Sequence, residues 1–135
     1  MSYINSPRLP APARVGLRVL YAMAAVVLII AAVHEGGIAT WQFWVFLVMP
    51  DIALVAGAAR GLERGQLHPR AVLLYNTLHR LLAPAGLAVL VLAAAPAWGA
   101  RATPWLIAPA AWAAHICIDR SLGFGLRDRD GFQRR

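Results

Sequence analysis

The sequence predicts an all-α fold, a four-helix transmembrane bundle with both the N- and the C-terminus in the cytoplasm. Of the 135 residues, 60% are hydrophobic and only 14% are charged, whereas globular domains average about 45–50% apolar and about 25% charged residues. A single domain of this length cannot bury so much apolar surface in its own core. Disorder is excluded as well, because disordered chains are poor in apolar residues. We therefore expect one integral membrane domain over residues 1–135.

Four apolar stretches are long enough to cross a bilayer, which takes about 20 largely apolar residues in a helix. None of them alternates with period 2, so helices rather than barrel strands satisfy the backbone. A cleavable signal peptide is disfavoured because the first apolar core is long and no A-x-A site follows it. Residues 1–14 are expected to form an irregular cytoplasmic arm. The predicted spans cover residues 17–33, 38–59, 71–95 and 104–122, and residues 123–135 form a cytoplasmic tail.

The charged residues predict the orientation of these spans. All 13 cations are arginines and the net charge is +7, but they form no continuous basic helix, so we read them as a topology signal rather than a nucleic-acid surface. They gather before the first span, between the second and third, and after the fourth, which places both termini at the cytoplasmic face of the inner membrane. Tryptophans flank the two arginine-poor connections, as in an interfacial belt. The bilayer is thus the expected partner, and a homo-oligomer or a membrane complex remains open.

Ionisable side chains fall near the middle of three different predicted spans. Counting about 1.5 Å per helical residue, Asp51 lies roughly 15 Å and His115 roughly 16 Å from the outer ends of their spans. His79 lies roughly 12 Å from the cytoplasmic end of its span. A charged group in hydrocarbon costs about 2.5 kcal/mol or more, so each of these residues needs a partner or a function. We expect the three side chains to converge between the helices.

Neighbouring polar residues extend this convergence into a candidate polar cluster. Helical pairs four residues apart share one face, and such pairs occur in the segments YNTLHR and HICIDR. Pro50 lacks a backbone donor and predicts a kink beside the carboxylate that follows it. The cluster comprises Asp51, Tyr75, Asn76, His79, Arg80, His115, Asp119 and Arg120.

Three interpretations of the cluster remain open, and none of its residues is assigned a catalytic role. In the first, the aspartates balance the arginines and the network is structural, as in a non-catalytic subunit of a membrane complex. In the second, Asp51, His79, His115 and Asp119 bind a divalent metal as cofactor, such as zinc or iron, in an enzyme that hydrolyses a lipid-like substrate. In the third, the titrating groups relay protons or ions in a small transporter.

Three segments, PDIALVAGAARG, YNTLH and AWAAHICIDRSLGFGLRDRDGF, resemble a bacterial membrane family catalogued as domain of unknown function 4260. The resemblance spans nearly the whole chain and implies a four-helix membrane protein without an assigned activity. Two features depart from the family pattern: residues 18–21 lack a carboxylate that members often carry early in the first helix, and the chain ends in GFQRR instead of continuing to a Thr-His-Leu-Gly ending. The positions that match its motifs are Pro50, Asp51, Tyr75, Asn76, His79, His115, Asp119, Arg120, Gly123 and Gly125.

Overall fold

The computed structural model describes residues 10–134, and within them the chain is all-helical. The prediction of an all-α fold is confirmed over this range. The first and longest helix, α1, covers Ala11–His34. The remaining elements are η1 (Gly37–Ala39), α2 (Trp41–Val48), η2 (Met49–Asp51), α3 (Ile52–Ala56), α4 (Pro69–Leu78), α5 (Leu82–Trp98), η3 (Gly99–Ala102) and α6 (Thr103–Leu122), where η denotes a 3₁₀ turn.

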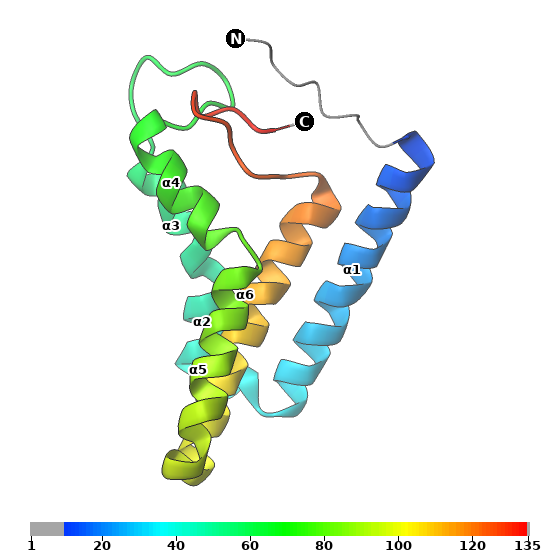
Figure 1. Cartoon of the computed structure of the whole chain (residues 1–135), viewed down its shortest axis with the longest axis vertical. Coiled ribbons are helices and arrows are strands. Elements are labelled where there is room, and N and C mark those ends of the chain that lie inside the picture. The colour runs from blue at the N-terminus through cyan, green and yellow to red at the C-terminus, as the bar shows by residue number, and fades with distance from the viewer. Residues whose placement is uncertain (1–9, 135) are drawn as a thin grey trace.

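The helices form an elongated bundle around α6, which packs against α1, α2 and α5 (Figure 1). The turns η1 and η3 lie at one end of the molecule. The start of α1, the loop of residues 57–68 and the segment after α6 lie at the other end. This arrangement is the one that an up-and-down order of the helices requires.

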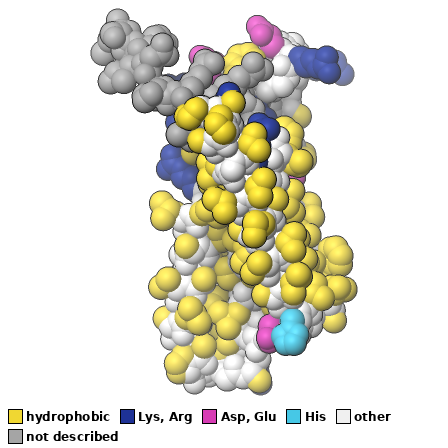
Figure 2. All heavy atoms as spheres, turned by 90° about the vertical axis from the view of Figure 1, so that its right-hand side faces the viewer, with side chains coloured by type: hydrophobic (Ala, Val, Ile, Leu, Met, Phe, Trp, Pro, Cys, Tyr) yellow, Lys and Arg dark blue, Asp and Glu magenta, His cyan; other side chains and the backbone are white. Residues whose placement is uncertain are grey.

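The outside of the bundle is apolar along most of its length. Two helical stretches, Ala11–His34 and Leu82–Leu122, are long and apolar enough to cross a membrane, and only 11% of the most apolar part of each is buried. The second stretch comprises α5, η3 and α6 and reverses at Gly99, whose φ is +55°. A shorter apolar stretch covers Trp41–Ala56. Figure 2 shows hydrophobic side chains spread over this exterior and the arginines gathered towards one end.

The element boundaries differ from the predicted spans in several places, and the helical part of the span predicted at 38–59 ends at Ala56. Helix α1 begins at Ala11, so residues 11–14 are helical rather than irregular, because Pro12 falls in the first turn, where its missing N–H costs nothing. Residues 1–9 of the predicted arm lie outside the described residues. The stretch 71–95 is not one helix but breaks between α4 and α5. Pro84 explains the break, since it cannot donate to the carbonyl of Arg80, which instead accepts from the N–H of Ala83 at 3.0 Å.

The helical stretch that covers the predicted span 38–59 changes geometry at Pro50, where the sequence predicts a kink. The 3₁₀ turn η2 separates α2 from α3 there and carries Asp51 as its last residue. Beyond it, α3 packs closely on α4, with Ala53 fully buried against Ala71 and Tyr75. The interruption therefore leaves Asp51 beside the packed pair of helices α3 and α4.

The segment after α6 folds back onto the loop that precedes α4. A backbone bridge joins Arg127 to Gln133, and the N–H of Leu67 donates to the carbonyl of Gly131 at 3.0 Å. Gly131 has φ of +92°, and a Cβ there would collide with the carbonyl of Leu67. Only glycine combines this backbone conformation with so close an approach.

Candidate metal centre

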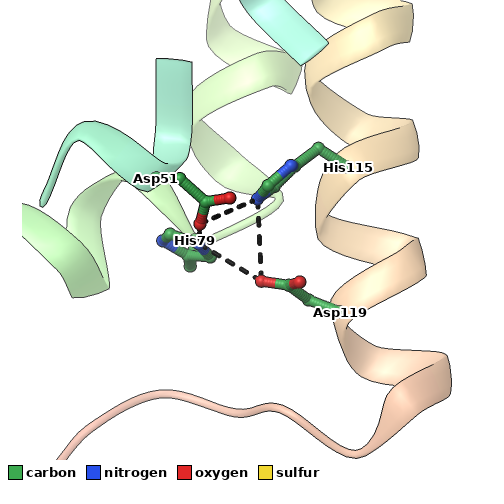
Figure 3. A group of neighbouring side chains, drawn as sticks. All are labelled: Asp51, His79, His115 and Asp119. Atoms are coloured by element: carbon green, nitrogen blue, oxygen red, sulfur yellow. Dashed lines mark ion pairs between the residues drawn. The ribbon is translucent and has the colours of Figure 1, made fainter. Parts of the chain in front are cut away.

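Four side chains from three elements point towards one another inside the bundle (Figure 3). Asp51 comes from η2, His79 directly follows α4, and His115 and Asp119 come from one face of α6. We call these four residues the His/Asp centre. One donor atom of each lies within 4.8 Å of the donor atoms of the other three. The structure thus brings together the three residues whose depths predicted convergence, Asp51, His79 and His115, and adds Asp119 to them.

The distances within the His/Asp centre resemble those between ligands of one metal ion. The Nε2 of His79 lies 3.2 Å from Oδ2 of Asp119 and 3.8 Å from Oδ1 of Asp51. The Nε2 of His115 lies 3.6 Å from each of the same two oxygens. Ligands about 2.0–2.1 Å from a tetrahedral zinc ion are roughly 3.3–3.4 Å apart. The four donor atoms lie within 4.8 Å of one another, so they would have to move closer together to form a complete coordination shell.

The ring of His79 is held with its Nε2 free to act as a ligand. Its Nδ1 lies 2.9 Å from the carbonyl oxygen of Tyr75, and a carbonyl can only accept, so the proton sits on Nδ1. The ring also stacks on Tyr75, with 3.9 Å between centroids. Metal-binding histidines characteristically donate their second N–H to a backbone carbonyl in this way, which fixes the tautomer and the ring orientation.

Both Nε2 atoms are buried without a hydrogen-bond partner among the described protein atoms. Buried polar atoms are satisfied in the large majority of cases, so an orphan needs an explanation. The side chains of His79 and His115 are only 3% and 11% exposed, whereas that of Asp51 is 46% exposed. The centre is therefore enclosed on the imidazole side and open on the side of Asp51.

The break between α4 and α5 presents His79 and is held by two side chains of α6. The carbonyl of Leu78 accepts from Nε1 of Trp112 at 2.8 Å. The carbonyl of His79 accepts from Nη2 of Arg120 at 3.2 Å. These bonds satisfy carbonyls that would otherwise lose their helical donors at the break. Helix α6 thus supplies two members of the centre and also fixes the position of a third.

The other predicted members of the cluster lie around the centre rather than in it. The side-chain amide of Asn76 donates to the carbonyl oxygen of Arg127 at 2.9 Å, and its Oδ1 accepts from the N–H of Arg127 at 2.8 Å. Arg80 is exposed, and Arg120 binds the backbone rather than a carboxylate. Within residues 10–134 the ion pairs join histidine to aspartate, and none of them joins an arginine to Asp51 or Asp119. Tyr75 supports the ring of His79, as described above.

Two residues that support the centre were not predicted from the sequence. Trp112 lies three residues before His115, and this helical spacing could have placed it on the same face of α6. Arg127 is buried, and its guanidinium lies 4.9 Å from the centre of the Tyr75 ring. No periodicity connects a residue of the tail to the centre, so no sequence signal indicated its role.

Fold and centre together define a class: a small helical bundle with an apolar exterior that encloses two histidines and two aspartates. The chain belongs to the family described as domain of unknown function DUF4260, whose sequence profile matches residues 16–135. This match confirms the family that the motifs indicated. Among curated proteins and among solved structures, the comparisons give no match to this chain.

Proposed function

We propose that the chain is an integral membrane protein with four spans, formed by α1, α2 with α3, α4 with α5, and α6. At about 1.5 Å per residue, the 24 residues of α1 reach roughly 36 Å and the 20 residues of α6 roughly 30 Å. The hydrocarbon core is about 30 Å thick. The low burial of the apolar stretches supports a lipid-facing exterior, because the core helix of a water-soluble protein would be mostly covered.

The distribution of charged and aromatic residues supports an orientation with both termini in the cytoplasm. Arginines gather at the end of the molecule that holds the start of α1, the loop of residues 57–68 and the tail. At the opposite end, η3 contains Arg101. Trp41 packs edge-on against Trp105, 5.6 Å between centroids, at the opposite end. Arginine on the cytoplasmic side and tryptophan at the interface are both typical of inner-membrane proteins.

Within this bundle, the His/Asp centre binds a divalent transition metal. The observation that carries this proposal is the pair of buried Nε2 atoms that make no hydrogen bond within residues 10–134 and face two carboxylate oxygens. Two imidazoles and two carboxylates suit zinc, iron or manganese, and the donor set alone does not choose among them. Such a metal, when bound by these four residues, would lower the pKa of a water that it holds. The open side at Asp51 would admit a lipid-like ester to that water.

A structural network is the competing function. The same distances fit two protonated imidazoles paired with two carboxylates, since the four charges would cancel. In that case the protein would be a non-catalytic subunit or a small proton carrier. Metal content separates these functions, because only the metal centre requires deprotonated Nε2 atoms that coordinate an ion.

The test is elemental analysis of the full chain purified in detergent, with variants His79→Ala and Asp119→Asn. We expect a single transition-metal ion per chain in the wild type and a loss of affinity of at least about 10–100-fold in each variant, because removal of a ligand costs no less than loss of its supporting partner. His34→Ala is the matched control, since His34 is exposed at the far end of α1. A wild-type chain that folds without metal, and gains none from added zinc, iron or manganese, would overturn the proposal.

A further inference from the structure

An open cavity of about 1180 Å³ lies between α1, the start of α5, the end of α6 and the tail. We call it the basic cavity. The residues of the His/Asp centre do not line this cavity. Arg80 and Arg120, which directly follow His79 and Asp119 in the sequence, do line it. Its lining includes no carboxylate. The arginines that line it are Arg14, Arg18, Arg80, Arg120 and Arg134.

Among the described residues 10–134, the charge of the basic cavity has no counterpart. Arginine stays protonated at any physiological pH, and none of the five forms an ion pair with a carboxylate in residues 10–134. Cations gathered around one concave surface repel each other and focus a positive potential into it. Guanidinium groups pair best with planar or tetrahedral oxyanions, above all with phosphate. The cavity therefore suits an anion.

Two glycines after α6 make room for these guanidinium groups. A Cβ on Gly123 would collide with the guanidinium of Arg18, and one on Gly125 would lie 3.3 Å from Nη1 of Arg120. Gly123 has φ of +92° and ends α6 in a left-handed turn. The turn thus serves two purposes, because it ends the helix and it lets arginines from α1 and α6 approach the same space.

Apolar side chains complete the lining and indicate what carries the anion. Leu17 comes from α1, Leu81 and Leu82 from the start of α5, and Phe124 from the segment after α6. All four are exposed on the protein surface. A free inorganic anion would gain nothing from them, whereas an acyl chain would bury against them and contribute about 0.8 kcal/mol per methylene group.

We propose that the basic cavity binds the phosphate head group of an anionic lipid, with the arginines on the phosphate and the leucines on the acyl chains. This site depends on the membrane placement of the bundle and does not depend on the metal. It lies at the arginine-rich end, where the head groups of the cytoplasmic leaflet would be. Arg120 reaches the carbonyl of His79 from the same region, so a lipid held here would sit next to the His/Asp centre.

The experiment compares three probes by calorimetric titration of the full chain in a neutral detergent: dihexanoyl phosphatidic acid, dihexanoyl glycerol and inorganic phosphate. We expect the phosphatidic acid to bind at least about tenfold more tightly than either of the others, because it alone offers both the charge and the chains. Inorganic phosphate that binds as well as the phosphatidic acid would overturn the assignment to a lipid. Equal binding of the neutral diacylglycerol would overturn the role of the arginines.

The variant Arg18→Gln/Arg80→Gln should weaken binding of the phosphatidic acid by about tenfold or more, a modest value because both arginines are exposed. The control Arg60→Gln/Arg64→Gln removes the same charge from exposed positions outside the cavity and should change binding less than about twofold. An equal loss in both double variants would reduce the effect to net charge and overturn the proposal. If the first variant does not fold, the comparison of probes on the wild type decides.

Binding of the phosphatidic acid should also persist after treatment with a chelator and in His79→Ala. That result would show that binding of the lipid does not depend on the metal. The lipid site can therefore be correct even if the proposed metal centre is wrong. Loss of phosphatidic acid binding in the chelated chain would place the head group on the metal instead, which would overturn the assignment to the arginines.

Discussion

The two imidazole rings of the His/Asp centre are oriented by different means. His115 stands on an unbroken helix one turn before Asp119, so the geometry of α6 fixes their separation. His79 stands at the end of α4, and its ring depends on the stack with Tyr75 and on the carbonyl that accepts its Nδ1 proton. The position of His79 also depends on donors from another helix. We therefore expect the centre to be most sensitive to substitutions around His79.

Trp112 offers a test of that support. Trp112→Phe keeps an aromatic ring but removes the N–H that donates to the carbonyl of Leu78. Because this carbonyl sits in a partly buried helix break, we expect the free energy of unfolding to fall by about 1–3 kcal/mol. Denaturation in mixed detergent micelles, followed by circular dichroism, measures the change.

The matched control is Trp44→Phe. Its Nε1 donates to the carbonyl of Ile38 at 3.0 Å, but this bond is exposed. Water can replace an exposed donor, so the loss should stay below about 1 kcal/mol. Equal losses in the two variants would show that the bond from Trp112 contributes no more than a surface bond.

At the level of helices, the sequence predicts the apolar stretches well and their interruptions less well. Apolar length and the lack of period 2 are local properties, and they suffice to place four helical stretches. Pro96 and Pro109 lie inside α5 and α6 without ending them, so a proline alone does not predict a break. The break before Pro84 coincides with donors from Trp112 and Arg120 on another helix. Such contacts between distant residues cannot be read from the pattern of one stretch.

The same reason explains which site residues were predicted. Counting the depth of Asp51, His79 and His115 needs only the span boundaries, and the structure brings these three together with Asp119. Pairing Asn76 with Arg80 assumes a continuous helix, and α4 ends at Leu78. The amide of Asn76 bonds the backbone of Arg127 in the tail, and Arg80 is exposed.

Pro84 provides the test at this scale. Pro84→Ala restores a backbone donor for the carbonyl of Arg80 and removes the clash of the ring with that turn. We expect α4 and α5 to join more continuously, which slows amide hydrogen exchange across residues 79–82. We also expect metal affinity to fall by about tenfold, because His79 is displaced although no ligand is removed.

The control for Pro84→Ala is Pro96→Ala, an exposed proline inside the same helix, α5. Pro96 lies 12 residues further on, roughly 18 Å along the helix, and the change should leave both readouts as in the wild type. Unchanged exchange across residues 79–82 in Pro84→Ala would show that the donors from α6 hold the break without the proline.

For the whole molecule, the polar functions lie towards one end of an apolar body. The basic cavity, the folded tail and the loop of residues 57–68 share the arginine-rich end, and the His/Asp centre lies deeper between the helices. The tail connects these parts, because Arg127 donates to the carbonyl oxygens of Gly65 and Gly131 and packs on Tyr75.

The orientation predicted from this asymmetry can be tested with introduced cysteines. Cys117, the single native cysteine, is buried and is replaced first by alanine. Glu35 and Glu63 are exposed at opposite ends of the bundle, after α1 and in the loop before α4. In intact cells, we expect a membrane-impermeant maleimide to label Glu35→Cys and to label Glu63→Cys only after lysis, because the proposed orientation places the arginine-rich end in the cytoplasm. The reverse pattern would invert the orientation, and a chain that stays in solution without detergent would contradict the membrane placement altogether.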